Sequence, residues 1–186
     1  MLRIMAHLLL AAPAAYAGDW RVDAGASSMT FETEAFGASV TGEISDFEAD
    51  IRLDPDAPES GRIEARVGVA SVDAGSNQFN DPLQSEAGFA PETHPDARFV
   101  SEQITETMDC EAGGGTRCYT AEGELILKGE TQPAALHFRL SVMDGRAIAD
   151  GELAIDRRDF GVGGSSWGDT GAEVTVRIHI EAVSAD

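Results

Sequence analysis

The sequence contains few cysteines, few basic residues and few long apolar runs. Each of these shortages excludes some classes of protein. Only two cysteines occur, with no second cysteine or histidine pair beside them, which disfavours a zinc site. Thirteen basic residues face 33 acidic ones, and the formal net charge of −20 disfavours nucleic acid and anionic membranes as partners. After residue 17 no apolar run approaches the ~18 residues of a membrane-spanning helix, so we expect a soluble mature chain without an integral membrane segment.

The recurrent signatures of catalysis and metal binding are missing as well. The sequence holds no H-E-x-x-H pair, no EF-hand loop and no G-x-S-x-G before a helix. His94 lies in a loop before a proline, while His137 and His179 alternate with apolar residues and are expected on the wet face of their strands. No two of them have the spacing of metal ligands. We therefore predict neither an enzyme nor a metalloprotein.

The first 17 residues resemble a secretory signal peptide. One positive charge, Arg3, precedes an apolar run over residues 4–12, and the segment ends in the small-x-small pattern Ala15-Tyr16-Ala17. The alternative, an N-terminal membrane anchor, is disfavoured because this run is too short to cross a bilayer. We expect cleavage after Ala17, a periplasmic location and a single domain over residues 18–186.

Export changes the interpretation of the two cysteines, Cys110 and Cys118. In an oxidising compartment a pair so close in sequence is most simply a disulfide, and the three glycines between the two residues suit a tight chain reversal. A metal site and a redox-active pair remain weaker alternatives, the latter because the spacing is not C-x-x-C. We predict a structural disulfide across a hairpin.

From Trp20 onward, apolar and polar residues alternate with a period of two. The segments that alternate, the first three most regularly, are 63–70, 136–143, 174–181, 27–36, 39–53, 97–110, 118–129 and 146–156. One apolar and one wet face are typical of antiparallel strands. The pattern predicts an all-β chain whose meander closes into a barrel of about eight strands. Such a barrel is either filled by side chains or just wide enough for a small ligand, and the alternation leaves both open.

Residues 76–96 interrupt the alternation. Asn77 and Asn80 are candidate caps for a short helix that stops near Gly88. We expect this insertion of helix and loop to cover an open end of the barrel. Its apolar contacts are expected from Phe79, Leu83 and Phe89.

A glycine-rich stretch, RRDFGVGGSSWGDTG, occupies residues 157–171. A phosphate-binding glycine loop leads into a helix N-terminus, whose free N–H groups face the anion. Here the loop leads into the alternating segment EVTVRIHIEA, so we interpret it as a connection between strands and not as a phosphate site. Two questions stay open: whether Phe160 and Trp167 line an entrance or seal the core, and whether Arg157 or Arg158 meets a ligand or pairs with nearby acids.

A set of short motifs follows the chain from residue 19 to residue 183. In order they are WRVD (20–23), SSMTF (27–31), GEISDF (42–47), VASVDAG (69–75), NDPL (80–83), HPDARF (94–99), LKGETQP (127–133) and RDFGVG (158–163). Each motif is weak alone, but the ordered set resembles the YceI-like family of exported, lipocalin-like, polyisoprenoid-binding proteins. The continuation Gly-x-x-Trp resembles the branch found beside cytochrome b561-type membrane proteins, which makes such a protein a candidate partner.

The resemblance implies an extended antiparallel, lipocalin-like barrel around a long apolar cavity that holds a polyprenyl tail, such as that of an isoprenoid quinone. Many members carry histidines where this chain has Ala26 and Ala35, so a head-group or metal role of those histidines does not carry over. The acidity of the chain disfavours a diphosphate head group and favours a neutral lipid. The residues expected to contact the lipid are Phe31, Phe36, Val67, Phe79, Leu83, Phe89, Phe138, Phe160 and Trp167.

Two functions follow from these expectations. The first is a periplasmic binding or carrier protein for an isoprenoid lipid, with no other cofactor. The second is an interaction or stress-response module that serves a membrane cytochrome b561-type partner and holds no ligand at rest. A lipid that co-purifies with the protein would distinguish the first from the second.

Overall fold

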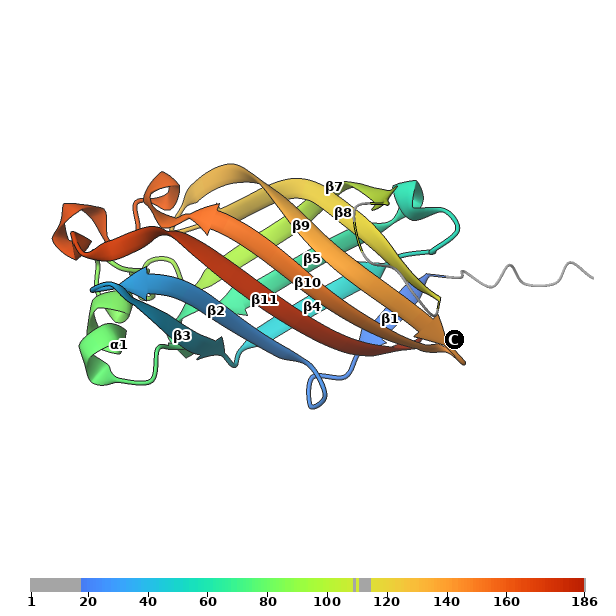
Figure 1. Cartoon of the computed structure of the whole chain (residues 1–186), viewed down its shortest axis with the longest axis horizontal. Helices are drawn as coiled ribbons and strands as arrows, with labels where there is room; N and C mark the ends of the chain where they lie inside the picture. The colour runs from blue at the N-terminus through green and yellow to red at the C-terminus, as the bar shows by residue number, and fades with distance from the viewer. Residues whose placement is uncertain (1–17, 109, 111–114, 186) are drawn as a thin grey trace, which may run out of the picture.

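The chain folds into a closed antiparallel barrel. The computed structural model describes residues 18–108, 110 and 115–185, and within them eleven strands belong to one sheet (Figure 1). The sheet closes through the order β1-β4-β5-β7-β8-β9-β10-β11, because β11 also pairs with β1. The ring therefore has eight strands, which confirms the predicted all-β barrel. The predicted signal peptide, residues 1–17, lies outside the described residues.

The elements follow one another in a simple order. The strands are β1 (Asp19–Val22), β2 (Ser28–Ala35), β3 (Ala38–Ile44), β4 (Phe47–Arg52), β5 (Arg62–Gly68), β6 (Val72–Asp73), β7 (Asp96–Thr107), β8 (Thr116–Leu127), β9 (Glu130–Met143), β10 (Arg146–Asp156) and β11 (Thr170–Ser184). The one α-helix of the described residues is α1 (Asn77–Gln84). Four 3₁₀ turns complete them: η1 (Pro58–Ser60), η2 (Val69–Ser71), η3 (Arg157–Phe160) and η4 (Gly164–Trp167).

Three positions of the ring are each filled by two short strands in succession. β1 and β2 both pair with β11. In the next position β4 pairs with β1, and β3 pairs with β2. In the third position β5 pairs with β4, and β6 pairs with β3. The prediction of one strand over 39–53 is therefore wrong, since Ser45 and Asp46 separate β3 from β4. Ile44 and Phe47 both face the interior although they are three residues apart, whereas residues on one face of a strand are separated by an even number of positions. The alternation therefore shifts by one residue between them, and this shift breaks the strand.

Strands β7 to β11 build the rest of the wall with long ladders. β8 pairs with β9 without a break from Thr116 opposite Ser141 to Leu127 opposite Glu130. β10 pairs in the same way with β11 along its whole length. Inward-facing apolar side chains from these strands form the main core.

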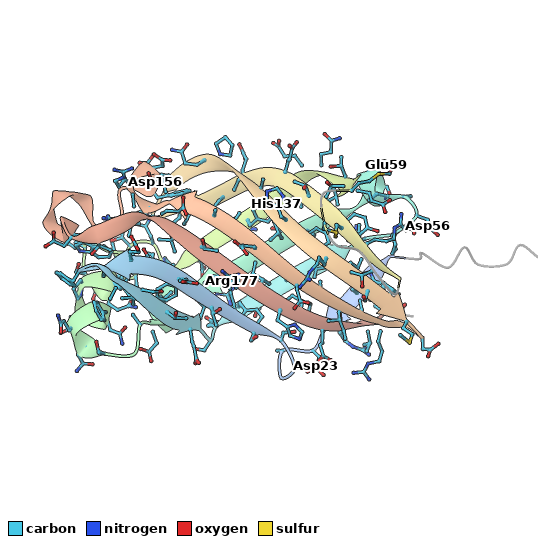
Figure 2. All side chains as sticks on the ribbon, viewed as in Figure 1. Asp23, Asp56, Glu59, His137, Asp156 and Arg177 are labelled. Carbon is cyan, nitrogen blue, oxygen red and sulfur yellow. A yellow bond between two sulfur atoms is a disulfide. The ribbon has the colours of Figure 1, made fainter. Side chains whose placement is uncertain are left out.

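The outer face of the barrel is polar, as the alternation requires. Figure 2 shows the side chains of His137 and Arg177 pointing away from the barrel. Arg177 forms ion pairs with Glu152 at 2.9 Å and Glu32 at 3.6 Å, on the strands to either side of β11. His179 lies on the same strand, with Nδ1 2.8 Å from the carboxylate of Asp150 on β10.

The insertion between β6 and β7 contains the predicted helix. Figure 1 shows α1 at one end of the barrel, opposite the end where the chain terminates. Ser76 is the N-cap residue, so the predicted caps were wrong. Asn80 instead accepts a hydrogen bond from the backbone N–H of Ala74 at 2.7 Å and donates one to Asp73 at 2.7 Å. These bonds fasten the helix to the strand before it.

The predicted disulfide joins Cys110 to Cys118, whose Cα atoms are 6.4 Å apart. It links the end of β7 to the start of β8, across the hairpin that the sequence predicts. Among the described residues, none of the helices has the length and apolar character needed to cross a bilayer.

Candidate functional site

The barrel encloses one long apolar cavity of about 460 Å³. Its volume falls within the range of small-molecule sites, about 300–1,000 Å³. On β11 alone its lining extends from Thr170 to Ala182, which is about 40 Å along the strand at about 3.3 Å per residue. The cavity therefore suits a long and narrow ligand.

The two ends of the cavity differ in exposure. At the end near β1 its lining includes the buried side chains of Leu53, Leu140 and Ala182 and the half-buried Trp20 and Ile51. At the end near α1 the lining includes exposed residues, with Phe36 67% exposed and Gln78 also open to solvent. The cavity is thus closed at the β1 end and open at the α1 end, which we call the mouth.

Eight of the nine residues predicted to contact a ligand line this cavity. They are Phe31, Phe36, Val67, Phe79, Leu83, Phe89, Phe138 and Trp167. The exception is Phe160, which is 3% exposed and packs in the main core outside the cavity lining. Phe160 ends η3, and Gly161 then turns the chain in the left-handed region with φ 63°, which separates this ring from the loop at the mouth.

Strand alternation places the lining residues in the middle of the barrel. Phe138 on β9 is buried and stacks on Tyr119 of β8, with 5.3 Å between ring centroids. Phe31 on β2 lies opposite Gly42 on β3, and a Cβ at Gly42 would collide with the Phe31 ring. The Phe31 ring therefore fills the space that a side chain at Gly42 would need.

At the mouth, α1 presents one apolar face to the cavity. Phe79 and Leu83 are four residues apart, so they lie on the same side of the helix. Phe89 follows in the loop, where its backbone N–H donates to the carbonyl oxygen of Leu83 at 2.8 Å. The helix and loop together cover part of the opening, as the sequence predicts.

Arg157 holds the glycine-rich loop at the other side of the mouth. This side chain is 6% exposed, and its guanidinium donates to four backbone carbonyl oxygens: Gly171 at 2.8 Å, Val162 at 2.7 Å, Thr170 at 2.9 Å and Trp167 at 3.4 Å. The guanidinium also lies 5.3 Å from the ring centroid of Trp167. Burial lowers the pKa of Arg157 from its ordinary value. The residue therefore positions Trp167 and uses most of its N–H donors on backbone carbonyl oxygens.

Other cations near the mouth also have partners. Arg158 donates to Asp156 through its guanidinium and its backbone N–H, which lowers the pKa of that carboxyl to about 2. The ammonium of Lys128 donates to the carbonyl oxygens of Ala87 at 3.1 Å and Gly161 at 3.0 Å. Of the two arginines, Arg157 thus binds backbone carbonyl oxygens and also lines the cavity, whereas Arg158 binds an acid.

Several polar lining residues were missed from the sequence. Thr33, Gln78, Asp169 and Thr170 line the cavity, and Gln78 and Asp169 are exposed at the mouth. Thr33 shares the inward phase of Phe31 on β2, so the period-two pattern contained this signal. Gln78 and Asp169 lie beside the alternating segments, where no periodicity marks their direction.

No group of three or more histidine, cysteine, aspartate or glutamate side chains could hold a metal ion in the part of the chain that the structure describes. The wall of the cavity consists mainly of aliphatic and aromatic side chains. Its chemistry is that of apolar contact, which requires shape and burial rather than charged anchors.

Comparison with known families agrees with this architecture. The family model described as the YceI-like domain matches residues 20–182. The chain belongs to the YceI-like family. The branch associated with cytochrome b561 stays a prediction.

Several known proteins are similar to most of the chain at low identity. A UPF0312 protein of Azotobacter vinelandii is 26% identical over 185 residues, covering 94% of this chain and 92% of that protein. The crystal structure of Burkholderia cenocepacia BcnA has a TM-score of 0.77 at 27% identity, covering 88% of this chain and all of that one. A polyisoprenoid binding domain from Saccharophagus degradans, implicated in plant cell wall breakdown, has a TM-score of 0.66 at 14% identity. The match covers 90% of this chain and 99% of that one.

Proposed function

We propose that this YceI-like protein is an exported binding or carrier protein that holds an isoprenoid lipid inside its barrel. The observation that carries the proposal is the shape of the cavity, which is long, apolar, closed near β1 and open near α1. A polyprenyl tail gains about 25 cal/mol for each Å² of apolar surface that the cavity removes from water. The tail therefore lies innermost and needs no polar anchor.

A neutral head group suits the mouth better than a diphosphate. Arg157, Arg158 and Lys128 already have hydrogen-bond partners in the protein, and Asp169 adds a negative charge to the lining. An anionic head group would have to displace one of these bonds and face the carboxylate. We therefore propose a quinone or a polyprenol as the ligand.

The proposal describes a binding protein and not an enzyme, because the wall is mainly aliphatic and aromatic and its acidic side chains, Glu48 and Asp169, are exposed to solvent. Two sequence features support a periplasmic location: the predicted signal peptide and the disulfide between Cys110 and Cys118, which an oxidising compartment favours.

Co-purification tests the proposal directly. Protein purified from the periplasm is analysed by native mass spectrometry and organic extraction, and the lipid-free protein is then titrated with a prenyl quinone. We expect an isoprenoid in the extract or uptake of the quinone. Absence of both results would overturn the carrier function and favour the ligand-free module that serves a membrane cytochrome.

A pair of variants on β9 locates the binding site. Phe138→Trp places a larger ring in the cavity, and we expect quinone affinity to fall by about tenfold, the effect of excluding one or two methylene groups. The matched control is Arg139→Trp, the next residue on β9, whose side chain points outward. Val67→Trp on β5 repeats the test from the opposite wall. Unchanged affinity in both cavity variants would place the ligand elsewhere.

A further inference from the structure

The barrel wall is interrupted along the line where β1 meets β4. Two pairs join these strands, Asp19 opposite Arg52 and Trp20 opposite Ile51. The next pair along the same line is Met29 opposite Ile44, between β2 and β3. Residues 21–28 on one side and 45–50 on the other therefore lie between two stretches of ladder without pairing to each other.

A cleft occupies this gap and shares part of its lining with the cavity. Its lining contains Trp20, Phe47, Ala49 and Ile51, all of which also line the cavity. Val22 belongs to the cleft alone. The same side chains border both spaces, so these side chains separate the cleft from the cavity, and we call the cleft the slot.

The slot has two chemically different layers. Its inner side consists of the half-buried apolar residues Trp20, Val22 and Phe47. Its outer rim carries charged residues, among them Arg21 and Asp50. The loop that carries Asp23, labelled in Figure 2, passes from β1 to β2 beside it. An apolar floor under a charged rim suits a hydrocarbon chain, which needs burial and no hydrogen bonds.

The position of the slot determines which part of a ligand can reach it. Phe47 packs both on the apolar cluster near α1 and on the main core, so it lies between the mouth and the closed end. Trp20 marks the far end of the slot, where its indole N–H donates to the carbonyl oxygen of Leu53 at 2.9 Å. A chain that enters at the mouth therefore meets the slot before it meets the closed end.

We propose that the slot receives the distal isoprene units of lipids whose chains are longer than the closed cavity. This inference rests on the proposed function and adds the range of ligands that the site takes. The closed end does not set an upper limit on chain length, because surplus units leave the cavity sideways and lie over Phe47 and Trp20. The protein thus binds prenyl lipids of different lengths with one head-group position.

Two alanines on neighbouring strands provide a matched test. Ala49 on β4 and Ala65 on β5 lie opposite each other and both line the cavity, but only Ala49 borders the slot. Each is replaced by phenylalanine, and each variant is titrated with farnesol and with the much longer solanesol. We expect Ala49→Phe to weaken solanesol binding by about tenfold more than Ala65→Phe, and the two variants to affect farnesol equally.

Thiol labelling gives a second readout that does not depend on affinity. The native cysteines form a disulfide, so Val22→Cys in the slot and Gln78→Cys at the mouth each carry the one free thiol of their variant. Solanesol is expected to slow maleimide labelling at both positions. Farnesol is expected to slow it at Gln78→Cys alone.

The outcomes separate the slot from the function on which it rests. If both prenols bind but solanesol leaves Val22→Cys fully reactive, or if the two alanine variants respond alike, the slot inference is overturned and the carrier function stands. A slot that takes a peptide strand instead of a lipid would give the same result. If neither prenol nor a prenyl quinone binds the wild-type protein, both proposals fail.

Discussion

The two halves of the barrel wall are built differently. Strands β7 to β11 contain 11 to 15 residues each and pair in long ladders, whereas β1 to β6 contain 2 to 8 residues each. The long-stranded half contributes most of the fully buried side chains, such as Ile104 and Tyr119. The short-stranded half borders both the mouth and the slot.

This difference shows how a small barrel can be stable and still have openings. A continuous ladder satisfies its backbone groups along its whole length and leaves no gap for a ligand. An interrupted ladder loses some of those bonds but gains places where the chain can turn away from the wall. In this protein the continuous half holds most of the fully buried side chains, and the interrupted half borders the mouth.

The largest expected contrast between the halves is in the cost of losing an aromatic side chain. Tyr119→Ala removes a side chain with 0% exposure from the continuous half, and we expect the free energy of unfolding to fall by about 4 kcal/mol. Phe47→Ala removes a half-buried ring from the interrupted half and is expected to cost about 2 kcal/mol. Urea denaturation measures both, and equal losses would contradict the contrast.

The second expected effect concerns the glycine-rich loop over residues 157–171, which connects β10 to β11. It tests whether this loop contributes to stability as the long strands do. Arg157→Met leaves four backbone carbonyl groups without their donor, so we expect a loss of about 3 kcal/mol and faster release of a bound lipid. The control is Arg158→Met, which removes an exposed ion pair and should leave stability near that of the wild type. Similar stabilities for the two variants would mean that the loop is held by other contacts.

The smallest expected effect is confined to one carboxyl at the end of β10. Hydrogen bonds from Arg158 lower the pKa of Asp156 from 3.8 to about 2. The ionised form is favoured in the folded state, so this contribution is fully present above the ordinary pKa and is lost as the pH falls through about 2. An NMR titration of Asp156 should show that midpoint, and Arg158→Met should raise it. A midpoint unaffected by the substitution would contradict the assigned cause.

The barrel could be predicted because its information is local and periodic. Alternation fixes which face each strand residue occupies, so Phe31, Val67 and Phe138 could be assigned to the interior without knowledge of their partners. The phase change between Ile44 and Phe47 was also present in the sequence and would have marked the break in the wall. Its consequence, the slot, depends on which strands pair, and alternation does not specify pairing.

The details of the mouth could not be predicted for a different reason. Arg157 binds carbonyl oxygens, which every residue has, so no pattern of side chains marks its partners. Phe160 and Trp167 lie in short 3₁₀ turns, where neither period two nor the period of an α-helix applies. The family resemblance suggested both as ligand contacts, and the direction of the backbone at Gly161 separates them.

The turn between β8 and β9 has one further consequence. Lys128, in that turn, is the only lysine of the chain, and its amine donates to two carbonyl oxygens next to the mouth. A reagent that acylates lysine therefore has a single ε-amine to modify, at the place where a ligand would enter. Because those hydrogen bonds must break before the amine can react, the rate of acylation reports how often this edge of the mouth opens.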